Sequence, residues 1–167
     1  MTIKTVSRTL VILAALFHFC SSHALSSENG TPAGCLESGF KREGGEVVLN
    51  PDAANKQSLF LLHNISGETF QVTHPVKNVG ASAGWTSEIG PGRWSAFAAD
   101  SKDFALSCVQ FADGNMKNLL CEKVLKVCEL PNPKMPPDLS GSFWVSENKN
   151  AEGVLAEIKS RGITWGE

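Results

Sequence analysis

The chain lacks tyrosine and has only four tryptophans among its 167 residues. Its longest apolar run, residues 10–19, contains about ten residues, whereas about 20 are needed to cross a bilayer. Lysine and arginine form no block, and the motifs of nucleotide-binding loops, zinc proteases and serine hydrolases are absent. These absences argue against stable membrane insertion, against a nucleic-acid or anionic-membrane partner and against the common catalytic centres.

The first residues have the layout of a secretory signal peptide. Lys4 and Arg8 precede the apolar run, and small and polar residues follow it, which predicts a signal peptide over residues 1–24 with cleavage after Ala24. Acylation of Cys20 is disfavoured because the residues before it are bulky. The mature chain would then carry 13 basic and 17 acidic side chains, fit one domain and be periplasmic or secreted.

Four cysteines remain after export: Cys35, Cys108, Cys121 and Cys128. An even number in an oxidising compartment predicts two disulfides. The segment CEKVLKVC alternates as a strand would, and seven strand residues separate its ends by about 23 Å. Cys121 and Cys128 therefore cannot bond to each other, because bonded cysteines have Cα atoms within about 7 Å.

A turn between two apolar runs narrows the choice. If Gly114 and Asn115 are the two loop residues of a type II′ hairpin, the register places Cys108 opposite Cys121. This favours Cys108 with Cys121 and, by elimination, Cys35 with Cys128. A one-residue bulge would shift the register and revive the pairing of Cys35 with Cys121.

Strand-like runs recur at short intervals, separated by turn residues. They predict a mainly β fold, an antiparallel sandwich or barrel of about seven short strands. The expected strands are residues 45–49, 58–63, 69–74, 84–89, 93–98, 104–111 and 119–128. Within the mature chain, the expected parts are a flexible leader (25–34), a disulfide-stabilised β-domain (35–130), a Pro-rich connector (131–141) and a C-terminal helical extension (142–167).

The strongest helix pattern lies in that extension. Ala151, Val154, Leu155 and Ile158 follow the i, i+3, i+4, i+7 spacing of one apolar face, and Gly162 fits the end of a helix closed by a Schellman motif, with Ile163 in contact with Ile158. A lone helix of this length is marginal, so its face must dock on the β-domain or on another protein. Flanked by Phe143, Trp144 and Trp165, it is our first candidate for a partner contact, through Phe143, Trp144, Leu155, Ile158 and Trp165.

Other chemistry-bearing residues have simpler interpretations. The hairpin expected around Ser66 and Gly67 staggers His63 and His74 along the sheet, so we expect neither a metal site nor a catalytic pair. We interpret Asp100 and Asp103 as part of a solvated turn between strands. Asn64-Ile65-Ser66 matches a glycosylation sequon. No catalytic residue and no cofactor is predicted.

Two tryptophans flank a Gly-Pro-Gly turn in GWTSEIGPGRW. A hairpin here would place Trp85 and Trp94 on one face with Ile and Ala, which favours core packing. The alternative is an aromatic platform for a glycan or peptidoglycan, with Trp85 and Trp94 as its ligand-binding residues.

The segments SAGWTSEIGPGRWSAFA, FALSCVQF and CEKVLKVC, with a short N-terminal cysteine segment, resemble the EnhB type of enhanced-entry protein from intracellular bacteria. The resemblance covers roughly residues 58–128. It implies an exported protein linked with host-cell entry or envelope function, and it brings no active site. The function expected is a non-enzymatic β-domain that binds a protein of the envelope or of a host cell; the glycan-binding module is the alternative.

Overall fold

The fold is mainly β, as the sequence predicts, with a C-terminal helix. The computed structural model describes residues 31–32, 34–37, 41–49, 57–74, 86–99, 104–139 and 143–166. The strands are β1 (Leu36–Glu37), β2 (Lys41–Glu43), β3 (Glu46–Leu49), β4 (Ser58–Asn64), β5 (Phe70–Thr73), β6 (Thr86–Ile89), β7 (Trp94–Ala99), β8 (Phe104–Ala112), β9 (Asn115–Leu119), β10 (Leu125–Leu130) and β11 (Phe143–Asn148). The helices are α1 (Cys121–Val124), the 3₁₀ turn η1 (Pro137–Leu139) and α2 (Ala151–Ser160).

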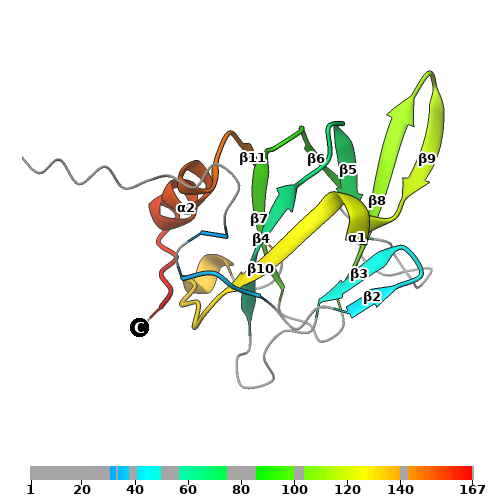
Figure 1. The fold of residues 1–167 in the computed structure, drawn as a ribbon. Coiled ribbons are helices and arrows are strands. Elements are labelled where there is room, and N and C mark those ends of the chain that lie inside the picture. Colours follow the sequence, from blue (N-terminus) through cyan, green and yellow to red (C-terminus); the bar gives the residue numbers. More distant parts are fainter. Residues whose placement is uncertain are drawn as a thin grey trace, which may run out of the picture.

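Two antiparallel sheets and the C-terminal helix form three layers (Figure 1). The central sheet has the strand order β1-β10-β4-β7-β11. The outer sheet has the order β2-β3-β8-β5-β6, and β9 pairs with β8 beyond the end of β3. Helix α2 covers the face of the central sheet that points away from the outer sheet, so the central sheet is buried on both faces.

Strand β4, SLFLLHN, shows why a strand of the central sheet has apolar residues at successive positions. All seven of its residues are buried. Phe60 and Leu62 enter the core between the two sheets, where Phe60 stacks on Phe97 at 5.5 Å between ring centroids. Leu59 and Leu61 enter the second core, beneath α2. A strand covered on both faces needs apolar residues at successive positions, whereas a half-exposed strand alternates.

Two of the predicted hairpins are wrong. Strands β6 and β7, which flank Gly90-Pro91-Gly92, lie in different sheets, and so do β4 and β5, which flank Ser66-Gly67. The Gly-Pro-Gly turn is tight, since Arg93 N–H donates to the Gly90 carbonyl at 3.0 Å, but it passes the chain from the outer sheet to the central one. Alternation identifies a strand and does not reveal which strand lies beside it.

The hairpin of β8 and β9 forms, with a different register from the predicted one. Ala112 pairs with Asn115, so Asp113 and Gly114 are the loop residues, and both have positive φ (52° and 75°). This is the backbone of a type I′ turn, which Asp-Gly favours, in place of the predicted type II′ turn. Cys108 consequently lies opposite Leu119. The strand predicted over residues 119–128 is interrupted, because residues 121–124 form α1.

Helix α2 ends as predicted. Ile163 N–H donates to the Ile158 carbonyl and Gly162 N–H to the Lys159 carbonyl, with Gly162 at φ +80°. These are the two hydrogen bonds of a Schellman motif. At the other end, the Asn150 side chain accepts a hydrogen bond from Gly153 N–H at 2.9 Å and caps the helix.

Candidate functional site

Both disulfides are the pairs favoured by the sequence. Cys35 bonds to Cys128 across 93 residues, and Cys108 bonds to Cys121 across 13, with Cα separations of 5.6 and 5.2 Å. The second bond arises differently from the prediction: α1, rather than a directly opposed strand position, carries Cys121 back to β8. The two disulfides indicate a non-cytoplasmic, oxidising compartment.

The C-terminal helix docks on the β-domain of its own chain, one of the two alternatives that the sequence left open. Ile158 is fully buried, and Leu155 packs partly buried against the same core beneath α2. Trp165 packs there too, with the Lys159 ammonium 5.1 Å from its ring centroid. Ile158 is therefore not available to a partner.

Residues 143–148 were expected in a helical extension and form a strand instead. They form β11, an edge strand in which Phe143 pairs with Ala98 and Trp144 with Phe97 on β7. The backbone of both predicted contact residues thus belongs to the central sheet, and the positions of their side chains lie outside the described residues. The described part of the segment after the prolines completes the central sheet and the core beneath α2.

Trp94 is also unavailable as a platform. Its side chain is buried, and its ring lies 4.1 Å from that of His63 with an angle of 3° between the planes (Trp94 on β7, His63 on β4). A sugar stacks on an open aromatic face, and here the imidazole covers one face of the indole. Trp85 lies outside the described residues. The burial of Trp94 matches the core packing that the sequence favours for it and leaves no open indole face for a glycan.

The two histidines lie in different parts of the fold, His63 on β4 of the central sheet and His74 directly after β5 of the outer sheet. His74 Nδ1 lies 3.0 Å from the Ala105 carbonyl oxygen. Burial lowers the pKa of His63 below its ordinary value of 6.5, the hydrogen bond to the Gly92 carbonyl opposes that shift, and the nearby Lys126 adds to it. Among the described residues, no three His, Cys, Asp or Glu side chains gather in a way that could hold a metal ion.

The lowered pKa of His63 predicts a loss of stability in acid. Below pH 6.5 the unfolded chain binds a proton on His63 before the folded chain does, so the free energy of unfolding falls as the pH falls toward the folded pKa. We expect His63→Gln to make urea unfolding less pH-dependent in this range. Lys126→Gln should do so partly, because it removes one of the causes of the shift. An unchanged pH profile in His63→Gln would contradict the assignment.

Asn64 joins the two sheets through its side chain. Its Nδ2 donates to the Glu68 carbonyl at 2.8 Å and to the Ile89 carbonyl at 2.9 Å, and its Oδ1 accepts from the Ser66 N–H and hydroxyl. The side chain is fully buried. Asn64 therefore closes the loop after β4 and the end of β6, and the sequon that it begins is inaccessible in the folded protein.

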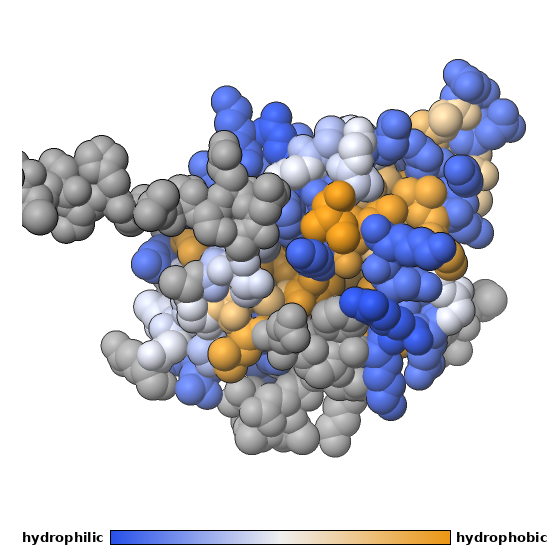
Figure 2. All heavy atoms as spheres, in the orientation of Figure 1, coloured by the Kyte–Doolittle hydropathy of each residue, from blue (hydrophilic) through white to orange (hydrophobic). Residues whose placement is uncertain are grey.

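The exposure of the β8–β9 hairpin is the feature that the sequence analysis missed. It projects from the outer sheet (Figure 1), and residues 111–118 are all exposed. Phe111 is 59% exposed and Met116 is 66% exposed, and they are paired directly across the hairpin. Figure 2 shows apolar atoms among hydrophilic ones on this projection. A Phe and a Met beside a polar turn, DGNMKN, were the available signal.

Comparison with known proteins adds no family to this description: no family model, curated protein or solved structure matches the chain. None of the helices within the described ranges combines the length and apolarity that crossing a membrane requires.

Proposed function

We propose that this chain is a non-enzymatic, exported β-domain that binds another protein, of the envelope or of a host cell, through the β8–β9 hairpin. The observation that carries the proposal is the cross-strand pair of Phe111 and Met116, 59% and 66% exposed at the end of a projecting hairpin. Single exposed apolar residues are ordinary, whereas adjoining ones favour an interaction surface. Aromatic residues and methionine are enriched in protein interfaces.

The backbone of β9 supports the same surface. Within the described residues β9 pairs only with β8, so its outer edge presents N–H and C=O groups that an extended segment of a partner can pair with. The disulfide between Cys108 and Cys121 fastens the base of the hairpin. A fixed base reduces the conformational entropy lost when a partner binds.

The cellular setting of the proposal has other support. The two disulfides favour an oxidising compartment, and the signal-peptide pattern of residues 1–24, which lie outside the described residues, favours export to the periplasm or beyond. A role in entry into host cells rests on the resemblance to enhanced-entry proteins. The glycan-binding alternative loses its support with the burial of Trp94.

Photocrosslinking from the hairpin tests the proposal. A photoreactive amino acid at position 116 should give a discrete crosslinked product with one protein in intact cells or at the surface of host cells. The same group at position 36 is the matched control, because Leu36 is as exposed as Phe111 (both 59%) and lies on β1 of the other sheet. We expect no such product from position 36.

The variant Phe111→Ser, Met116→Ser completes the test. Both side chains are exposed, so the change should alter the free energy of unfolding by less than about 0.5 kcal/mol per site. It should nevertheless abolish the crosslink when the photoreactive group is placed at position 118, on the same strand. Identical products from positions 116 and 36, or a crosslink that survives the double substitution, would refute the proposal.

A further inference from the structure

A second feature, separate from the hairpin, is a pocket of about 390 Å³ at one end of the central sheet. It is lined by His63, Asn64, Ile65, Ser66, Gly92 and Lys126. No residue of the hairpin takes part, and no lining residue is a carboxylate. Lys126 is the only lining residue that carries a full charge at neutral pH, since burial favours the neutral form of His63.

The walls of the pocket are held in place by hydrogen bonds. Gly92 N–H donates to the Asn64 carbonyl at 3.0 Å, Asn64 N–H donates to the Arg93 carbonyl at 3.0 Å, and Ile65 N–H donates to the Val124 carbonyl at 2.9 Å. The Asn64 side chain ties the Ser66 side of the pocket to the same frame. The pocket is therefore largely formed before any ligand arrives, as small-molecule sites usually are.

His63 presents a hydrogen-bond acceptor to this pocket. The Gly92 backbone is a hydrogen-bonding neighbour of the ring, and the stack on Trp94 fixes the plane of the ring. In a neutral imidazole one nitrogen carries an N–H, and the other carries a lone pair that accepts. An N–H or O–H group of a ligand satisfies it.

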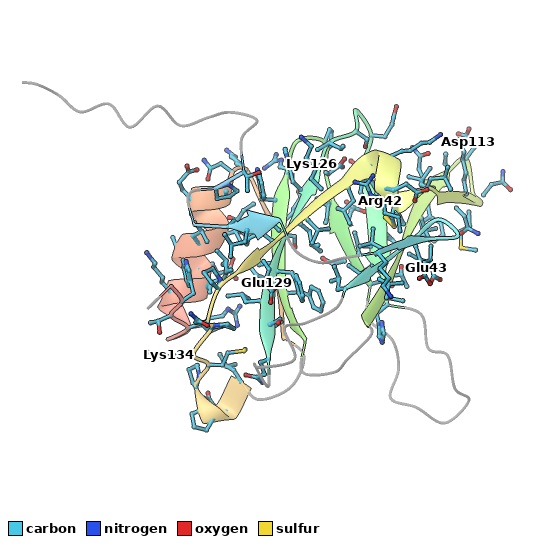
Figure 3. All side chains as sticks on the ribbon, turned by 60° about the horizontal axis from the view of Figure 1, so that its bottom comes forward. Arg42, Glu43, Asp113, Lys126, Glu129 and Lys134 are labelled. Carbon is cyan, nitrogen blue, oxygen red and sulfur yellow. A yellow bond between two sulfur atoms is a disulfide. The ribbon has the colours of Figure 1, made fainter. Side chains whose placement is uncertain are left out.

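Lys126 provides the complementary charge beside it. Lys126 pairs directly with His63 across β10 and β4, and it makes no ion pair with any residue that the structure describes. It lies near the α1 end of β10, whereas Glu129 lies near the opposite end (Figure 3). A lone ammonium matches one carboxylate, and a charge-assisted hydrogen bond to it is stronger than a neutral one.

We propose that this pocket binds a carboxylate that carries an N–H or O–H donor on the neighbouring atom. Lys126 binds the carboxylate, His63 accepts from the neighbouring donor, and Ile65, 42% exposed at the rim, contacts the apolar part of the ligand. Two sources offer this chemistry: a small 2-hydroxy acid, and the free C-terminus of a peptide, whose last amide N–H adjoins its carboxylate. A metal ion does not fit, because the lining supplies one imidazole and a cation.

Titration of the oxidised, ¹⁵N-labelled full chain tests the site. Three probes are used: lactate, N-acetylalanine with a free carboxylate, and N-acetylalanine amide. We expect saturable shifts of the Ser66 and Gly92 amide signals with one or both acids and none with the amide. Binding of either acid supports the site, and the tighter acid identifies the source.

Matched lysine variants separate the site from general charge effects. Lys126→Gln should weaken binding of the tighter acid about tenfold, the effect of one lost charge-assisted hydrogen bond. Lys117→Gln removes the same charge from an exposed position on β9 and should leave the affinity unchanged. Equal effects of the two variants, equal binding of the amide, or no saturable shift with any probe would overturn the proposal, and none of these outcomes bears on the hairpin.

Discussion

Replacing Cys35 and Cys128 together by alanine is expected to lower the free energy of unfolding by about 4 to 5 kcal/mol. This bond closes a loop of 93 residues, and in the chain-entropy model the stabilisation grows with the logarithm of loop length. It also links the start of the described fold to β10, the neighbour of β1 in the central sheet. Equilibrium unfolding in urea measures the loss.

The other disulfide is the control for this prediction. Cys108 and Cys121 close a loop of only 13 residues, so replacing both by alanine should cost about 3 kcal/mol on the same model. The difference between the two double variants is therefore expected to be about 1 to 2 kcal/mol. An equal or larger loss for the short loop would contradict the entropic account and place the stabilisation in local contacts around the hairpin base.

Elements whose chemistry is local were predictable from the sequence. Helix α2 needs only its own apolar spacing and the glycine after it, and the structure reproduces both the buried face and the closing hydrogen bonds of Gly162 and Ile163. Strands β4 and β7 were recognisable by their apolar content for the same reason. In these elements, the residues that determine the conformation lie within a few positions of it.

Pairing between strands was much less predictable, because it depends on distant residues. The turn Gly90-Pro91-Gly92 is suited both to a hairpin and to a crossing between sheets, and only the hydrogen bonds of Asn64 with β6 and with the Gly92 and Arg93 backbone distinguish them. The predicted register of β8 and β9 was wrong for a local reason. Asp113-Gly114 and Gly114-Asn115 both suit two-residue turns, and they differ in register by two positions.

The candidate sites were missed because the sequence does not reveal exposure. Phe111 continues the apolar strand β8, and continuity of that kind usually indicates core, yet the hairpin extends beyond the layer that would cover it. The pocket at His63 depends on loops that meet only after the two sheets have packed. Conversely, the sequence does not show that Ile158 is covered. One of the strands that cover it, β7, is distant in the sequence, and the other, β11, was not recognised as a strand.

The burial of Ile158 leads to the second large expected effect. Ile158→Ala should lower the free energy of unfolding by about 2 to 5 kcal/mol, because it leaves a cavity between α2 and the central sheet. The loss should appear as one shift of the whole urea transition, since α2 packs on β7 and β11 and shares their core. A helix that served only as a partner contact would tolerate the change without loss of stability.

An exposed position on the same helix completes the comparison. Glu152 lies one residue after Ala151 and is exposed, so Glu152→Ala should change the free energy of unfolding by less than about 0.5 kcal/mol. If Ile158→Ala proved as mild, α2 would not be part of the core, and its apolar face would again be open to a partner. If Ile158→Ala is severe while the crosslink from position 116 persists in the folded fraction, α2 stabilises the fold and the hairpin binds, because the two roles then respond to different substitutions.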